Sequence, residues 1–129
     1  EQFDTALRIP LYSTPNQALE NAGTCALGAS LIRPAEVYFS RLVQLQPFNS
    51  RGYQGLAAIA LKTARFDEVR RQVRMGLNAQ PTTPELYFYG ACAERNLRDQ
   101  GAEDSYVQQL KSRFPDSSLN EQLRKGGCQ

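Results

Sequence analysis

The sequence of 129 residues contains no histidine and no tryptophan, and it has only three cysteines. Histidine is the commonest general base and the commonest metal ligand in proteins, so both kinds of site lack their usual residue. The cysteines, Cys25, Cys92 and Cys128, show no Cys-x-x-Cys spacing, which argues against a zinc site. We therefore expect no metal and no cofactor.

Long apolar runs and a strong net charge are missing as well. No segment approaches the ~18 consecutive apolar residues that span a bilayer. Fifteen basic and thirteen acidic residues leave a net charge of only +2, which gives no indication of nucleic-acid binding. No glycine-rich phosphate-binding loop follows a segment with the sequence pattern of a strand. No general base is evident that could activate a serine or cysteine as a nucleophile. We expect that the protein is not an enzyme.

Three prolines recur at a constant interval. Pro47, Pro81 and Pro115 are spaced 34 residues apart, and the residues between them keep the same register. Large apolar residues occupy one position of each unit and small residues another, namely Leu19, Tyr53 and Tyr87, then Gly23, Ala57 and Ala91. A period of 34 residues is typical of helix–turn–helix units that stack their apolar faces on one another.

This pattern resembles the tetratricopeptide repeat. It predicts an all-α fold, a right-handed superhelix of antiparallel helix pairs, in a single domain over 1–129. The expected repeats are 16–49, 50–83 and 84–117, and the expected helices are 15–29, 34–46, 50–63, 66–79, 84–97 and 102–114. Each periodic proline would end a second helix, since proline lacks the backbone N–H. The third repeat departs from the pattern at Gly101, where an aromatic residue is usual, and at Glu103, where a small residue is usual. The alternative is a generic helical bundle with prolines recurring by chance.

The two ends of the chain fit a repeat array differently. Residues 1–9 resemble the end of a second helix whose first helix is missing, so we expect the C-terminal part of a longer array. Ser118 and Glu121 have the spacing of a capping box and predict a short helix over 118–125, closed by Gly126 and Gly127. Such a helix would cover the open face of the last repeat. The alternative is a disordered tail.

The first helices of tetratricopeptide repeats line a concave groove, and here they carry candidate binding residues. These are Gln17, Glu20, Thr24, Arg51, Gln54, Lys62, Phe88, Arg95 and Asn96. Three of them are cations, and Leu27 and Leu61 add apolar surface. Of the neighbouring aromatics Phe88 and Tyr89, at least one is expected to pack. A peptide or helix with an acidic and apolar face would suit this groove. The alternative is a solvated face without a ligand.

Two further clusters have open interpretations. Cys92 would form a disulfide with Cys128 if the tail folds back over the last repeat. Cys25 and Cys92 lie two repeats apart, which is too distant for a disulfide. The alternative is three packed or free thiols.

Four arginines gather in one segment at Arg65, Arg70, Arg71 and Arg74. They are interpreted as a solvated helix face partly paired with acids, with an anion site as the alternative.

Three stretches carry a more specific resemblance. LYSTPNQALEN at 11–21, AEVYFSRLVQLQP at 35–47 and YVQQLKSRFPDS at 106–117 resemble the pilotin of type IV pilus assembly, the PilF/PilW-type lipoprotein. The resemblance implies a lipid-anchored protein on the periplasmic face of the outer membrane that helps the pilus secretin to reach the membrane and multimerise. The lipidated cysteine of that family lies upstream, so none of the three cysteines here has that role.

Two other classes of function stay open. The first is a general repeat adaptor of the chaperone-cofactor type, which would be cytoplasmic. The version that grips a carboxylate needs lysine and asparagine on successive first helices, where this chain has Glu20, Gly55 and Tyr89. The second is an enzyme with its catalytic domain in sequence upstream of this chain.

Overall fold

The computed structural model describes residues 15–128. Seven helices and no strand are found in this range, which confirms the predicted all-α fold. The helices are α2 (Pro15–Gly28), α3 (Ile32–Leu45), α4 (Ser50–Lys62), α5 (Phe66–Leu77), α6 (Pro84–Asn96), α7 (Gln100–Arg113) and α8 (Ser118–Arg124). The partial helix expected over 1–9 lies outside the described residues.

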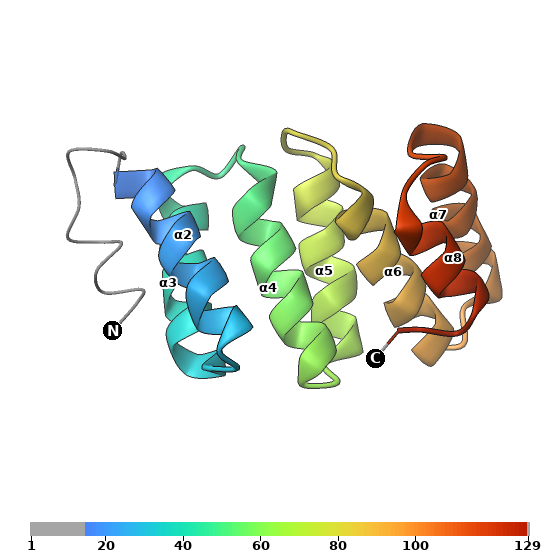
Figure 1. Cartoon of the computed structure of the whole chain (residues 1–129), viewed down its shortest axis with the longest axis horizontal. Coiled ribbons are helices and arrows are strands. Elements are labelled where there is room, and N and C mark those ends of the chain that lie inside the picture. The colour runs from blue at the N-terminus through green and yellow to red at the C-terminus, as the bar shows by residue number, and fades with distance from the viewer. Residues whose placement is uncertain (1–14, 129) are drawn as a thin grey trace.

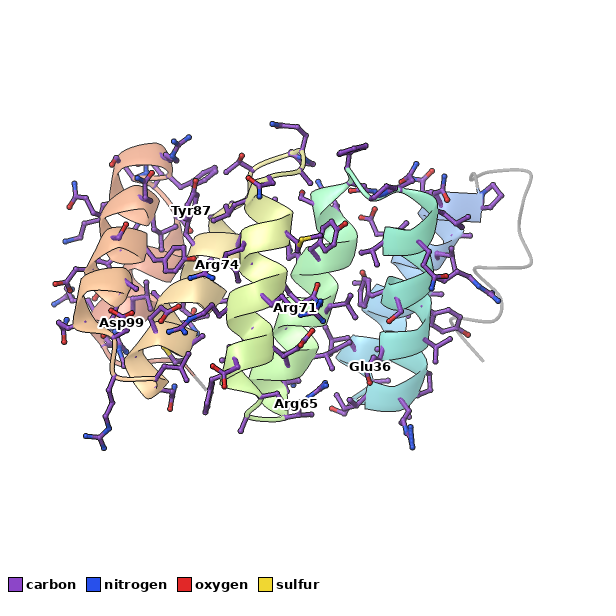
Figure 2. All side chains as sticks on the ribbon, turned by 180° about the vertical axis from the view of Figure 1, so that it is seen from behind. Glu36, Arg65, Arg71, Arg74, Tyr87 and Asp99 are labelled. Atoms are coloured by element: carbon purple, nitrogen blue, oxygen red, sulfur yellow. A yellow bond between two sulfur atoms is a disulfide. The ribbon has the colours of Figure 1, made fainter. Side chains whose placement is uncertain are left out.

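The helices form two layers that run along the length of the molecule (Figure 1). The first layer consists of α2, α4, α6 and α8, and each of these helices contacts the next one in its layer. The second layer consists of α3, α5 and α7, which contact first-layer helices but not one another. Because successive helices touch one another in the first layer but not in the second, the array curves toward the first layer. The first layer is therefore the inner, concave side, and Figure 2 shows the outer side.

Two glycines let the two layers approach closely. The Phe39 ring of α3 lies against Gly23 of α2 and Gly55 of α4. A β-carbon added at Gly55 would lie 2.5 Å from ring atoms, and one at Gly23 would lie 2.8 Å away. Phe39 is buried as a result, in a cluster with Leu19, Leu42 and other apolar residues. Packing at native density thus requires a residue without a side chain at both positions.

The proline-containing loops contact each other across the repeats. The Gln80 N–H donates to the Phe48 carbonyl at 3.1 Å, and the Ser50 N–H donates to the Gln80 carbonyl at 2.9 Å. Because of these hydrogen bonds, the chain leaves the helical conformation before Pro81. As a consequence α5 ends at Leu77, two residues earlier than predicted, and Pro81 does not itself end the helix.

The predicted C-terminal helix is α8, which begins at Ser118 as expected and ends at Arg124, one residue earlier than expected; its capping residue differs from the prediction. The N-cap is Ser117, whose hydroxyl oxygen accepts from the Leu119 N–H at 3.2 Å, so the predicted cap at Ser118 is wrong. Glu121 instead forms ion pairs with Arg124 and Lys125 further along the helix. The helix closes before Gly126, whose φ of +78° suits glycine.

The contact between Gly55 and Phe39 gives a test of the fold. We expect Gly55→Ala to lower the free energy of unfolding by about 1–3 kcal/mol, because the added methyl group must displace the ring. Gly28→Ala is the matched control, since a β-carbon there would meet nothing within 4 Å. It should leave stability unchanged or raise it by up to about 1 kcal/mol through helix propensity. Urea denaturation followed by circular dichroism measures both changes; equal stability of the two variants would contradict the packing argument.

Candidate protein-binding groove

A groove of about 620 Å³ lies on the concave side between α2, α4 and α6. Glu20 and Thr24 of α2 form one wall, and Glu85 and Tyr89 of α6 form the other. Arg51, Gln54, Gly55 and Ala58 of α4 lie between the two walls. The floor is open because Gly55 and Ala58 have almost no side chain.

Helical spacing explains which residues line the groove. Residues 51, 54, 55 and 58 follow the i, i+3, i+4, i+7 pattern, and 20 and 24, like 85 and 89, are one turn apart. Residue 55 was missed as a lining position because the repeat register singles out residues 54 and 58. The helical face that contains these two also contains residue 55, so the signal was present in the sequence.

Several polar contacts hold the walls of the groove in place. Arg51 Nη1 lies 3.6 Å from Glu20 Oε2, which joins α4 to α2. The Thr83 hydroxyl donates to Gln54 Oε1 at 2.7 Å and so joins the start of α6 to α4. Thr83 occupies the N-cap position of α6 but makes no side-chain capping bond, since its hydroxyl is used in this contact.

Glu85 and Tyr89 form the polar part of the α6 wall. Burial of the Tyr89 phenol, followed by the nearby negative charge of Glu85, raises the pKa of Tyr89 above its usual value. Among residues 15–128, Glu85 has no hydrogen-bond or ion-pair partner, and its side chain is half-buried. An acceptor that lacks a partner in this way is available to a ligand.

Four of the nine predicted groove residues line this cavity: Glu20, Thr24, Arg51 and Gln54. Gln17 and Lys62 are exposed near the ends of their helices and do not line it. Arg95 and Asn96 border a separate polar hollow with Arg98, Gln100 and Glu103. Of the apolar residues expected there, Leu27 lines the groove and Leu61 does not.

Phe88 is not available to a partner, which corrects the sequence-based expectation. Its exposed fraction is only 6%, and it packs in one cluster with Cys92 and Leu123. The physical reason is α8, which lies against the face of α6 that carries these residues. Tyr89, the neighbouring aromatic residue, is the one that faces the groove.

The C-terminal segment is fastened to α6 by a disulfide and by one arginine. Cys92 and Cys128 are joined in a disulfide, with their Cα atoms 5.4 Å apart. Arg95 Nε donates to Glu103 Oε2 at 2.7 Å, and Arg95 Nη2 donates to the Leu123 carbonyl at 3.3 Å. Glu103, the departure from the repeat pattern, is thus the partner of Arg95. Both charges are used internally, so Arg95 contributes no free cation to the concave side.

The charge of the groove therefore differs from the expected one. Arg51 is the one cation among the lining residues that the structure describes, and it already pairs with Glu20. Two carboxylates, Glu20 and Glu85, line the same cavity. The three cations expected in the groove are not brought together in this cavity, because Lys62 and Arg95 lie outside it.

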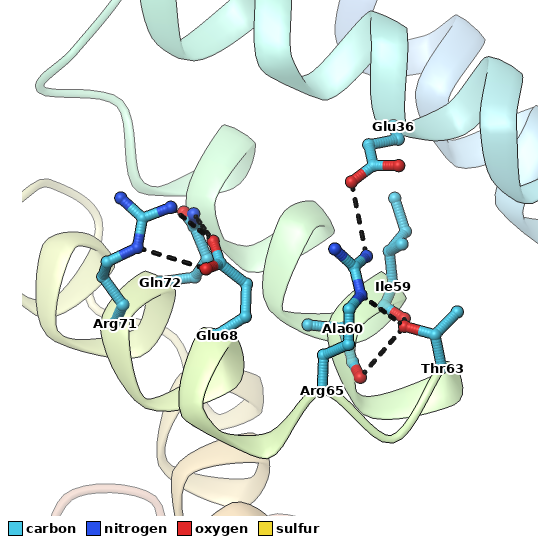
Figure 3. Close-up of polar contacts among 8 residues, drawn as sticks. All are labelled: Glu36, Ile59, Ala60, Thr63, Arg65, Glu68, Arg71 and Gln72. Atoms are coloured by element: carbon cyan, nitrogen blue, oxygen red, sulfur yellow. Dashed lines mark hydrogen bonds and ion pairs between the residues drawn. The ribbon is translucent and has the colours of Figure 1, made fainter.

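Three of the four clustered arginines, Arg65, Arg70 and Arg71, are paired with acids, and Figure 2 shows the outer side on which Arg65 and Arg71 lie. Arg71 Nη2 donates to Glu68 Oε2 at 2.6 Å, and Arg65 Nη2 donates to Glu36 Oε2 of α3 at 3.3 Å, as Figure 3 shows. Glu68 also accepts from Gln72 Nε2 at 2.7 Å. These internal pairs favour a solvated, ion-paired face over an anion site.

The remaining arginine of interest, Arg70, meets a buried carboxylate. Glu94 of α6 has an exposed fraction of 2%, and Arg70 donates to both of its oxygens, at 2.9 and 2.5 Å. The hydrogen bonds to Glu94 raise the pKa of Arg70 above its usual value. This bidentate ion pair joins α5 to α6. Sequence reasoning missed Glu94, since an acid in the segment GACAERN gives no signal that it is buried.

Two features of residues 15–128 bear on other functions. No group of three or more histidine, cysteine, aspartate or glutamate side chains within 15–128 is placed to hold a metal ion. None of the helices in that range combines the length and the apolar character needed to cross a membrane.

Two solved structures have the same fold. PilF of Pseudomonas aeruginosa matches with a TM-score of 0.77 at 18% sequence identity, over 96% of this chain and 57% of that one. PilW, described as a widely conserved type IV pilus biogenesis factor, matches with a TM-score of 0.74 at 24% identity, over 95% of this chain and 56% of that one. No protein-family model and no curated protein sequence matches the chain.

These matches confirm the predicted fold, which is like that of tetratricopeptide-repeat proteins, and the resemblance to the PilF/PilW type at the level of structure. Identities of 18% and 24% are shared by many proteins of one fold and different function, so the matches establish the fold alone. The chain spans little more than half the length of either structure.

The disulfide gives a second test of stability. We expect Cys128→Ser to lower the free energy of unfolding by about 2–4 kcal/mol, because the bridge that joins residues 36 apart restricts the unfolded chain. Cys25→Ser, which changes the free cysteine, is the control and should have a small effect. A reductant should destabilise the parent protein and the control variant but not Cys128→Ser. If the reductant has no effect on the parent, the bridge does not form in solution.

Proposed function

We propose that this chain is a protein-binding scaffold in type IV pilus biogenesis, and that it helps the pilus secretin to reach the outer membrane and multimerise there. It binds a segment of its partner in the concave groove and carries out no reaction. The observation that supports the proposal most directly is the groove between α2, α4 and α6, on a fold shared with two pilus proteins.

The groove has the properties that peptide recognition requires. Its walls come from three separate helices, each of them anchored in the core, so the binding surface is rigid before a partner arrives. Polar side chains on both walls can position a ligand, and the small residues Gly55 and Ala58 on the floor leave room for a helix or an extended strand of the partner.

The proposed location is the periplasmic face of the outer membrane, with the full-length protein held there by a lipid. The disulfide between Cys92 and Cys128 supports this location over the cytoplasmic alternative, since disulfides persist in oxidising compartments such as the periplasm. We also propose that the repeats are 16–49, 50–83 and 84–117 and that α8 caps the array; the helix pairs that follow one another along the chain support this division.

A general adaptor that binds another protein would use the same groove. The carboxylate-gripping version of such an adaptor is not supported, because Glu20, Gly55 and Tyr89 occupy the positions that lysine and asparagine would need. What favours the pilus partner is the shared fold with PilF and PilW, and a binding experiment separates the two possibilities.

The test is capture of the purified pilus secretin from the same organism by immobilised chain 1–129. We expect Thr24→Tyr to weaken binding about tenfold or more, because the new ring occupies the groove. Ser112→Tyr is the matched control. Each hydroxyl donates to the carbonyl four residues earlier, at 2.9 Å from Thr24 and 2.8 Å from Ser112, and both residues are exposed. Biolayer interferometry gives both dissociation constants.

Three outcomes are informative. Capture that Thr24→Tyr weakens and Ser112→Tyr does not supports the groove as the secretin site. Capture that neither variant weakens keeps the secretin as partner but removes the groove as its site. The parent chain's failure to capture the secretin would overturn the proposed partner.

A further inference from the structure

The groove carries an uncompensated negative charge, and this charge defines the chemistry of the segment it accepts. Three ionised side chains line the cavity, Glu20, Arg51 and Glu85. Arg51 is already 3.6 Å from Glu20 and balances it. The charge left over is that of Glu85.

The surroundings of Glu85 favour a cationic partner. The residue lies in the first turn of α6, and its half-buried carboxylate has no donor among residues 15–128. Partial burial weakens solvation of the charge, so a cation that reaches it gains more than it would at an open surface. The Tyr89 phenol lies one turn further along the same wall, close enough for the Glu85 charge to raise the pKa of Tyr89.

The floor beside Glu85 suits the apolar stem of a basic side chain. Gly55 and Ala58 form an apolar surface on the floor, and the half-buried Tyr89 ring borders it. Lysine and arginine bury their methylene groups along such surfaces while the charged head reaches a polar partner. The aromatic ring adds a favourable surface for the cation.

An acidic segment fits the same cavity poorly. It would have to take Arg51 from Glu20 and would still face the negative charge of Glu85. Like charges brought together in a partly desolvated groove repel each other, which selects against such a partner.

We propose that the groove recognises a protein segment with a lysine or arginine among small and apolar residues, and that this basic side chain crosses the Gly55–Ala58 floor to pair with Glu85. The inference rests on the proposed function, since it names the kind of segment that the same groove binds. It reverses the charge that the sequence alone suggested for the partner.

The experiment uses three fluorescein-labelled nine-residue peptides of alanine, leucine and serine that differ only in the central residue, which is Lys, Gln or Glu. Fluorescence anisotropy with the whole chain 1–129 gives the dissociation constants. We expect the Lys peptide to bind about tenfold more tightly than the Glu peptide, with the Gln peptide between them. Raising the salt from 50 to 500 mM should shrink this difference.

Variants of the chain assign the preference to one carboxylate. Glu85→Gln should weaken binding of the Lys peptide and leave binding of the Gln peptide unchanged. Asp67→Asn is the matched control, because Asp67 is an exposed acid in the first turn of α5, outside the groove. It removes the same charge from the same helical position and should leave the preference for the Lys peptide intact.

The proposal is overturned if the three peptides bind equally, if the Glu peptide binds best, if none binds at about 1 mM, or if Asp67→Asn and Glu85→Gln have the same effect. These outcomes are separate from the test of the pilus partner. Secretin capture without a preference for the Lys peptide would remove this inference and keep the proposed function. A Lys preference without secretin capture would keep the groove chemistry and remove the secretin.

Discussion

The close approach of the two helix layers at Gly55 is the contact on which the fold and the groove both depend. The Phe39 ring occupies the space next to Gly55, where a side chain would otherwise lie, and so holds α3 against α2 and α4. The same glycine lies on the floor of the concave groove. A larger residue would therefore push against the Phe39 ring, which also borders the groove, and would separate the layers. Stability and binding are coupled at this position through the volume of a single residue.

The C-terminal segment determines where the groove ends. In an open array, the face of α6 that carries Phe88 and Cys92 would be free for the next helix or for a partner. Here α8 occupies that face, the disulfide to Cys128 fastens it, and Arg95 turns toward the Leu123 carbonyl. An apolar face that would otherwise be exposed is thus covered within the chain. The cost is a shorter groove, which consists of α2, α4 and the first turns of α6.

Charge has a different role on each side of the molecule. On the outer side, acids and arginines pair with each other, as Glu36 does with Arg65. Between α5 and α6, the buried Glu94 depends on Arg70, since a buried carboxylate without a partner would be strongly destabilising. In the groove, Glu85 has no such partner among residues 15–128. The buried charge of Glu94 is therefore balanced within the chain, whereas the charge of Glu85 lies where a ligand can reach it.

The sequence by itself determined the class of fold and most of the helix bounds, because the 34-residue period and the helical spacing of large and small residues are local properties. It also placed Glu20, Thr24, Arg51 and Gln54 in the groove through the repeat register. Only the tertiary structure decided that Phe88 is buried and that Arg95 is used internally. The burial of Phe88 and the bond from Arg95 to the Leu123 carbonyl depend on where α8 packs, a contact between segments about 30 residues apart that no local pattern encodes. The sign of the groove's charge was decided by the placement of Lys62 and Arg95 outside the cavity and of Glu85 inside it.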